Sequence, residues 1–79
     1  MLSIDEFINV MKSDNISPKA ITNARITLTQ LNEFKTLEEV TQSDIVDFIN
    51  YIREKYNYKE STVGVRKSYI KKYFKYNDM

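Results

Sequence analysis

The sequence predicts an all-α protein of four helices joined by short connections. Glycine and proline occur once each, at Gly64 and Pro18, which is too few for the tight turns of an all-β chain. Apolar residues recur at three- and four-residue intervals, the spacing of one helix face. Residues that favour helix starts precede several of these stretches. At 79 residues, the chain is expected to form one domain, residues 1–79.

The first two helices are predicted from their caps. In the segment SIDE, Ser3 can cap a helix and Glu6 can reach back to it, which is a capping box. This helix is expected to end within residues 12–15. In SPKA, Ser17 is the expected cap and Pro18 the first helical residue, where its missing N–H costs nothing. The apolar faces expected from these two helices are Ile4, Phe7, Ile8, Met11, Ile21, Ala24, Leu28, Leu31 and Phe34.

Residues 35–40 are predicted to connect these helices to the third, with a helical turn of their own. Thr41 is the expected cap of the third helix, and Asp44 lies in its first turn, where the helix dipole favours a carboxylate. The side chains expected in the core from this part of the chain are Leu37, Val40, Ile45, Phe48, Ile49, Ile52 and Tyr56.

The last helix follows the segment KYNYKES and has a less clear start. Its sequence has the same layout as that of the second helix, 42 residues earlier. Lys59, however, occupies the position that corresponds to Ser17 of the second helix. Because lysine is a poor cap, Asn57 or Ser61 is the expected cap instead. The side chains expected to face the core are Val63, Ile70, Tyr73 and Phe74.

Composition argues against most enzyme chemistry. The chain has no cysteine and no histidine, so zinc and iron–sulfur sites are not expected, and a serine nucleophile lacks its usual base. The neighbouring acids at residues 38–39 and 44–47 are better explained by the dipole of a helix start than by acid–base catalysis. A single glycine does not make a phosphate-cradling loop. We therefore expect no cofactor, no metal and no catalytic residue.

The location expected from the sequence is cytoplasmic. The absence of cysteine fits a reducing compartment. The N-terminus MLSIDEFINVMK carries acids and no basic segment before an apolar one, unlike a signal peptide. No stretch approaches 18 apolar residues, so no contact with a membrane interior is expected.

Charge is distributed unevenly along the chain. Residues 1–54 hold nine acidic and five basic side chains, a net charge of −4, whereas residues 55–79 hold two acidic and seven basic ones, a net charge of +5. Lys67, Lys71 and Lys75 follow one another at four-residue intervals and form one row along the last helix. Like charges at this spacing repel each other, so the row suggests an anionic partner. A solvated face, or a surface for protein or lipid, is also compatible with the row.

Two helix starts carry side chains suited to DNA. The beginning of the last helix is small and polar, which suits entry into a DNA groove with lysines on phosphates. The second helix repeats the arrangement with fewer charges and offers groups for phosphates and base edges. The candidate DNA-binding residues are Lys19, Thr22, Asn23 and Arg25 in the second helix, and Thr62, Arg66, Lys67, Ser68 and Lys71 in the fourth.

Taken in order, four segments resemble the N-terminal core-binding (SAM-like) domain of phage-type integrases, the tyrosine recombinases. The segments are IDEFINVM, SPKAITNARITLTQLNEF, VTQSDIVDFINYI and STVGVRKSYIKKYFKY, and they span nearly the whole chain. The resemblance implies a four-helix SAM-like orthogonal bundle whose second and fourth helices lie against the DNA major groove. In that family a larger C-terminal domain supplies the catalytic arginine, lysine, His-x-x-Arg pair and tyrosine. This chain lacks histidine and cannot contain that site.

The resulting hypothesis is a non-catalytic DNA-binding fragment of a recombinase, which clamps recombination-site DNA for integration or excision by a catalytic domain. Its expected partners are double-stranded DNA and, in the full-length protein, other recombinase protomers; the fragment alone is expected to be a monomer. The alternative is a stand-alone helical protein-interaction module with a basic docking face.

Overall fold

The computed structural model describes residues 1–78, and within this range it contains helices and no strand. In chain order the elements are α1 (Ile4–Ser13), α2 (Pro18–Phe34), the short 3₁₀ helix η1 (Leu37–Glu39), α3 (Gln42–Tyr56) and α4 (Glu60–Asn77). The prediction of an all-α chain with four main helices is confirmed. The connector also contains the helical turn that the sequence predicts.

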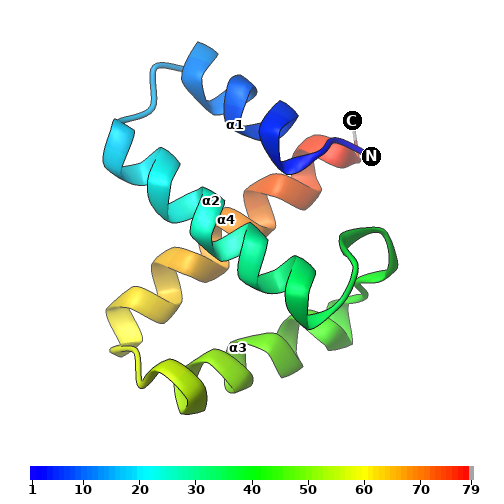
Figure 1. Ribbon diagram of the computed structural model, residues 1–79, viewed down its shortest axis with the longest axis vertical. Coiled ribbons are helices and arrows are strands. Elements are labelled where there is room, and N and C mark those ends of the chain that lie inside the picture. The colour runs from blue at the N-terminus through cyan, green and yellow to red at the C-terminus, as the bar shows by residue number, and fades with distance from the viewer. Residues whose placement is uncertain (79) are drawn as a thin grey trace.

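The two longest helices, α2 and α4, cross near their middles (Figure 1). In this view α1 lies beside the crossing pair at one end of the molecule and α3 at the other. Helix α1 packs on α2, and α3 packs on α4. The starts of α2 and α4 lie on the same side of the molecule, the left in Figure 1, and the two chain ends lie on the opposite side. The fold therefore presents the two predicted DNA-binding helix starts on one side.

Side chains cap three of the four main helices at the N-terminus. Ser3 and Thr41 form capping boxes with the third residues of α1 and α3, and the Ser17 hydroxyl accepts the Ala20 N–H at 3.3 Å. Helix α4 differs, because its cap position is Lys59, which makes no capping hydrogen bond. The expectation that Asn57 or Ser61 caps α4 was wrong. Asn57 instead adopts the left-handed conformation that ends α3, with φ of 52°.

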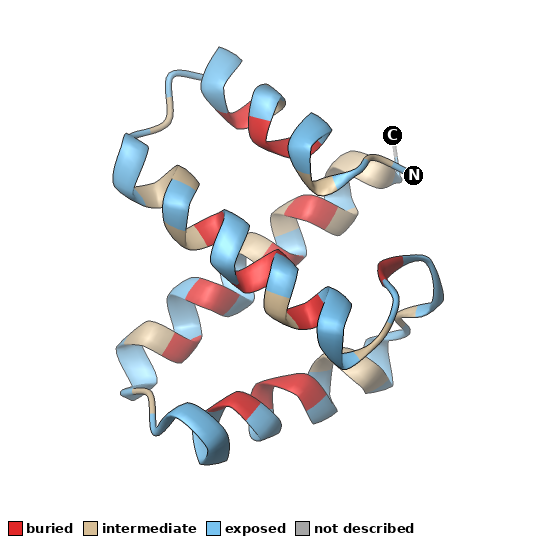
Figure 2. Cartoon of the chain, viewed as in Figure 1, coloured by how far each residue is buried: buried red, intermediate tan, exposed pale blue. Residues whose placement is uncertain are grey.

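One hydrophobic cluster is shared by all four main helices (Figure 2). Most of the predicted apolar faces lie in it, and Leu37 of η1 adds to it. The buried apolar residues are Phe7, Ile8, Met11, Ala24, Leu28, Leu31, Leu37, Phe48, Ile49, Ile52, Val63, Ile70 and Tyr73.

The predicted core differs from the observed one at the ends of two helices. Phe34 and Tyr56 were expected in the core but are each 38% exposed, because they lie in the last turns of α2 and α3. Ile4, Ile21, Val40, Ile45 and Phe74 are only partly buried. Thr27 and Arg66 are buried instead, although their residue types did not suggest it. Each lies on a face of its helix that the α2–α4 crossing covers.

Hydrogen bonds join the end of α4 to the start of the chain. The Tyr73 hydroxyl donates to the Leu2 carbonyl at 2.6 Å, and the Leu2 N–H donates to Asn77 Oδ1 at 2.6 Å. Tyr76 donates to Asp14 Oδ2 at 2.7 Å, which raises the pKa of the tyrosine. Phe7 packs edge-on against the Tyr73 ring with centroids 5.3 Å apart. These contacts hold α1 against the C-terminal half of α4.

Replacing Lys59 with serine is expected to stabilise the fold. A serine hydroxyl can accept a backbone N–H of the first turn of α4, a role that no side chain has at present. The expected gain is about 1 kcal/mol in the free energy of unfolding relative to Lys59→Ala, measured by urea denaturation. Comparison with alanine isolates the cap from the loss of charge. Equal stability of the two variants would contradict the prediction.

Stability should fall at acid pH in part because of Asp44. Its pKa is lowered, first by the Thr41 N–H that donates to it at 2.8 Å and then by Lys35, whose ammonium lies 3.0 Å away. Because the folded-state pKa is the lower one, the stabilisation is present above the unfolded-state pKa and lost as pH falls through the folded-state value.

The free energy of unfolding should therefore decrease between roughly pH 5 and pH 2, and less steeply in Asp44→Asn than in the unchanged chain. Asp47→Asn removes the same charge on the same helix and serves as the control. Denaturation curves at several pH values measure the effect. Parallel pH profiles for Asp44→Asn and the unchanged chain would rule out this role for Asp44.

Candidate nucleic-acid interface

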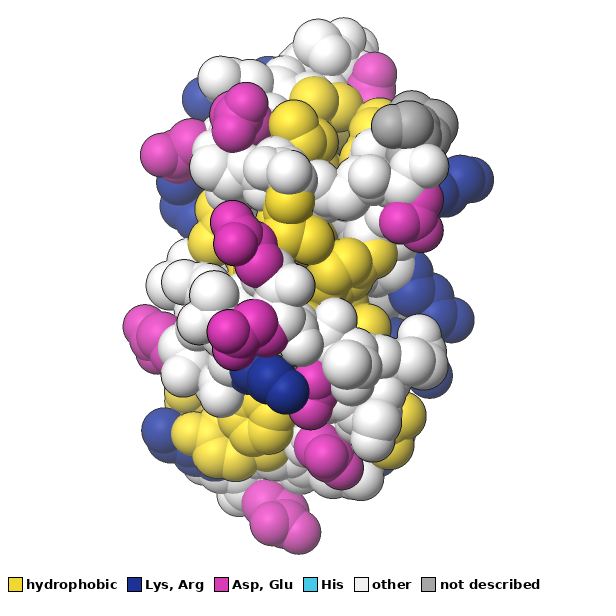
Figure 3. Space-filling view, turned by 90° about the vertical axis from the view of Figure 1, so that its right-hand side faces the viewer, with side chains coloured by type: hydrophobic (Ala, Val, Ile, Leu, Met, Phe, Trp, Pro, Cys, Tyr) yellow, Lys and Arg dark blue, Asp and Glu magenta, His cyan; other side chains and the backbone are white. Residues whose placement is uncertain are grey.

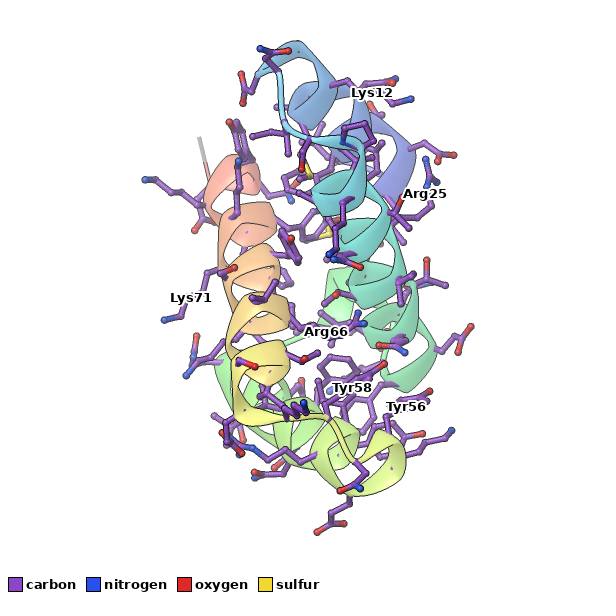
Figure 4. All side chains as sticks on the ribbon, turned by 90° about the vertical axis from the view of Figure 1, so that its left-hand side faces the viewer. Lys12, Arg25, Tyr56, Tyr58, Arg66 and Lys71 are labelled. Carbon is purple, nitrogen blue, oxygen red and sulfur yellow. The ribbon has the colours of Figure 1, made fainter. Side chains whose placement is uncertain are left out.

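The outer face of α4 carries a row of lysines. Lys67, Lys71 and Lys75 are exposed and recur once per turn, and Lys72 is partly exposed beside them. Figure 4 shows Lys71 pointing outward from α4, on the side opposite α2. Figure 3 views the side that carries the chain ends, where acidic side chains are spread across the surface and basic ones lie mostly along its edges.

None of these lysines forms an ion pair within residues 1–78. The ion pairs of that range join Arg25 to Asp5, Lys35 to Asp44, and Arg53 to Glu60. Lys67, Lys71 and Lys75 line a hollow together with Gln42 and Ile45 of α3. Phe74 and Asp78 of the C-terminal end also line it, without an ion pair between Asp78 and these lysines. An exposed cationic row without carboxylate partners is well placed to bind an anionic polymer.

A second hollow lies between the start of α4 and the N-terminal half of α2. It is lined by Asn23, Ser61, Thr62, Val65 and Arg66. Asn23 and Thr62 are partly exposed there, so their polar groups can reach a ligand. This hollow, which we call the α2–α4 groove, brings together one predicted residue of α2 and two of α4.

The remaining predicted residues of α2 lie in different places. Lys19 and Thr22 are exposed in the first turns of α2. Arg25 pairs with Asp5 of α1 at 2.6 Å, and Figure 4 shows it on the side of α2 away from α4. Both partners are well exposed, so the pair is an ordinary surface ion pair. The structure therefore directs Arg25 toward α1 and away from the groove.

Arg66 is the least expected feature of this surface. It is 9% exposed, and its Nη1 donates to the Thr27 hydroxyl at 2.9 Å. Its guanidinium carbon lies 4.6 Å from the centroid of the Tyr58 ring, a cation–π contact. Figure 4 shows Arg66 between α2 and α4, with Tyr58 and Tyr56 below it. We expected an exposed DNA-binding arginine, whereas most of this side chain is enclosed and fixed.

The contacts of Arg66 continue into both neighbouring elements. Thr27 passes the hydrogen bond on by donating to the Asn23 carbonyl at 2.8 Å. Gln30 donates to the Tyr58 hydroxyl at 3.3 Å, and the Tyr58 ring stacks on Tyr56 at 5.3 Å. This network links α2 to the α3–α4 connection and to α4. It fixes the position of the α4 start relative to α2.

The nine predicted residues consequently fall into separate groups. Asn23, Thr62 and Arg66 share the α2–α4 groove, while Lys67 and Lys71 line the hollow toward α3. Ser68 is exposed on the outer face of α4, where its hydroxyl donates to the Val65 carbonyl. Lys19 and Thr22 are on the surface of α2, and Arg25 faces α1.

Sequence reasoning left out two residues of these surfaces. Val65 lines the groove, and Lys72 lines a hollow with Lys71 and Lys75 of the basic row. The spacing of α4 could have identified both, because they lie within one turn of predicted residues. Val65 is 46% exposed and offers an apolar surface suited to a thymine methyl group.

Exposed aromatic side chains form a patch at the other end of α2. Phe34 and Tyr51 lie with ring centroids 5.1 Å apart, and Lys55 donates to the Tyr51 hydroxyl at 2.8 Å. This hydrogen bond raises the pKa of Lys55. The Lys55 ammonium also lies 5.5 Å from the Tyr56 ring. The patch is mixed aromatic and basic in character, and its aromatic side chains are of the kind enriched at protein–protein interfaces.

Comparisons with known proteins identify no relative. No family model matches the chain, and no curated protein or solved structure matches it. Residues 1–78 contain no group of three or more acidic, histidine or cysteine side chains arranged to hold a metal ion. No helix in the same range has the length and apolar character needed to cross a membrane.

Removing the Thr27 hydroxyl should destabilise the fold through Arg66. Thr27→Val keeps the shape of the side chain but leaves Nη1 of a buried guanidinium without its acceptor. The expected loss is about 1–3 kcal/mol in the free energy of unfolding, measured by urea denaturation. Thr29→Val changes an exposed threonine of the same helix and is expected to have little effect. A loss no larger than that of Thr29→Val would show that the hydrogen bond contributes nothing.

Proposed function

We propose that this chain binds double-stranded DNA through the surface formed by α4 and the start of α2. The observation that carries the proposal is the row of lysines on α4. Lys67, Lys71 and Lys75 are exposed, follow one another at helical spacing, and have no acidic partner within residues 1–78. Such a row fits the phosphates of a nucleic acid strand, and binding would release the counterions that otherwise screen it.

Groups for reading bases lie next to the row. Asn23 and Thr62 line the α2–α4 groove. The first half of α4 also presents small side chains, at Ser61, Gly64, Val65 and Ser68. Apart from its chain neighbours and the backbone of α4 itself, nothing lies within 4 Å of the place where a Cβ would extend from Gly64. A helix with small side chains near its start and lysines from Lys67 onward suits insertion into the major groove.

We further propose that the chain is the core-binding domain of a tyrosine recombinase, with its four helices arranged as a SAM-like orthogonal bundle. The support is the order of the four sequence segments, together with two helices that start on the same side of the fold (Figure 1). In this role the chain clamps recombination-site DNA, and a separate catalytic domain performs the cleavage and joining. The chain itself then works in a reducing cytoplasm.

Charge reversal at Lys71 should weaken binding to all DNA sequences. Lys71→Glu is expected to reduce affinity for a duplex roughly tenfold at low salt, because it replaces a phosphate contact with repulsion. Fluorescence anisotropy with a labelled duplex measures the affinity. With about three phosphate contacts, log Kd should change with log salt concentration with a slope of magnitude near 3, reduced by about 1 in the variant.

Lys12→Glu is the matched control, since it makes the same charge change on α1, away from α4 (Figure 4). Equal effects of the two variants would mean that only net charge matters and that α4 is not the binding surface. Amide shifts in the NMR spectrum locate the surface directly. If duplex DNA moved no amide of α4, and a protein partner moved those around Phe34 and Tyr51, the protein-interaction alternative would replace this proposal.

A further inference from the structure

We infer that the start of α4 and Arg66 form a binding site for a phosphate group, and that a phosphate of the DNA backbone occupies it. The site lies in the α2–α4 groove, away from the lysine row. The inference rests on the proposed function for the source of the phosphate. Two independent features of the groove support it: an uncapped helix start and an incompletely paired buried guanidinium.

The start of α4 has free hydrogen-bond donors. The first amides of a helix have no acceptor within the helix, and at α4 the cap residue Lys59 supplies none from its side chain. Side chains of the cap residues accept such amides in α1, α2 and α3. The amides of Ser61 and Thr62 thus remain available beside the groove, at the positive end of an 18-residue helix.

Arg66 lies one turn after Thr62 and lines the same groove. Long side chains on a helix point back toward its N-terminus, which directs the guanidinium toward these amides. Only Nη1 has a hydrogen-bond acceptor within residues 1–78; Nε is buried without one. No carboxylate in that range pairs with this guanidinium. A nearly buried cation of this kind lacks a counter-charge, which an anion in the groove would supply.

The surroundings of Arg66 favour a bound phosphate, because no carboxylate of the described residues pairs with the guanidinium. Tyr58 fixes the guanidinium from one side through the 4.6 Å cation–π contact, so the fork is oriented before the ligand binds. Asn23 adds an amide donor at the edge of the groove. The nearest acid in sequence, Glu60, is held by Arg53 through bonds of 2.9 and 3.1 Å. Glu60 thus has a partner of its own, and its side chain is exposed to solvent.

Binding of inorganic phosphate to the whole chain tests the site. In a ¹⁵N NMR titration at constant ionic strength, the amides of Ser61 and Thr62 and the Nε–H of Arg66 should shift in a saturable manner. Lys59→Asp places a carboxylate on the free amides and should weaken phosphate binding at least tenfold relative to Lys59→Ala, which removes the lysine charge without capping. Phosphate that moved none of these signals, or that bound both variants equally, would overturn the inference.

A second pair of variants keeps the test independent of the helix cap. Asn23→Asp puts a negative charge into the groove and should abolish the phosphate-induced shifts. Asn9→Asp makes the same change on the exposed surface of α1 and should leave them unchanged. Equal shifts in the two variants would exclude the groove as the site.

A duplex DNA titration distinguishes failure of this site from failure of the proposed function. If DNA moves the Ser61 and Thr62 amides and Lys59→Asp weakens its binding, the site takes a backbone phosphate as inferred. If DNA moves only amides near Lys67 and Lys71, the inference is wrong and DNA binding stands. If phosphate binds saturably but DNA shifts no amide signal, the anion site stands and the proposed function fails. The natural ligand of the site is then a phosphorylated molecule other than DNA.

Discussion

The crossing of α2 and α4 is the contact on which the rest of the structure depends. Each of the other two main helices packs mainly on one member of this pair, so its position follows from the crossing. Apolar residues supply most of the contact, but Arg66 and Thr27 place a charged hydrogen bond within it. A chain of 79 residues has a small core and little stability in reserve. A buried charge at the central contact is therefore costly, and the cation–π contact with Tyr58 and the Thr27 hydroxyl offset only part of that cost.

Under the proposed function, the same arrangement would separate two tasks on one helix. The outer side of α4 carries exposed lysines, which would attract an anionic polymer at a distance and impose little geometry. The side facing α2 carries an enclosed guanidinium beside helix-start amides, which would bind an anion at a defined place and orientation. Long-range attraction and precise positioning would thus come from opposite sides of α4. A ligand that only met the lysines would bind in many registers.

Much of the fold could be predicted from local sequence signals. Pro18, Ser17 and the capping boxes define helix starts through contacts within one turn, and the apolar stripes define which faces are buried. The site was harder to predict, because it depends on which helices meet. From the sequence, Arg66 is indistinguishable from a surface arginine, but in the fold Thr27 and Tyr58 enclose it. In the same way, the packing of α1 on α2 brings Asp5 to Arg25 and pairs it. Lysine at position 59 already indicated that α4 has no side-chain cap, and the prediction of Asn57 or Ser61 as the cap was wrong.

The hydrogen bonds between Leu2 and the end of α4 give the first residues an influence on geometry at the far end of the chain. Tyr73 and Asn77, on successive turns, form hydrogen bonds with the Leu2 backbone, so the N-terminus helps to orient the final turn of α4. Any polypeptide joined after Asp78 would depart along a direction that Leu2 helps to set. An affinity tag or a deletion at the N-terminus would then disturb the relative orientation of a C-terminal neighbour, while leaving the α2–α4 groove at the start of α4 intact.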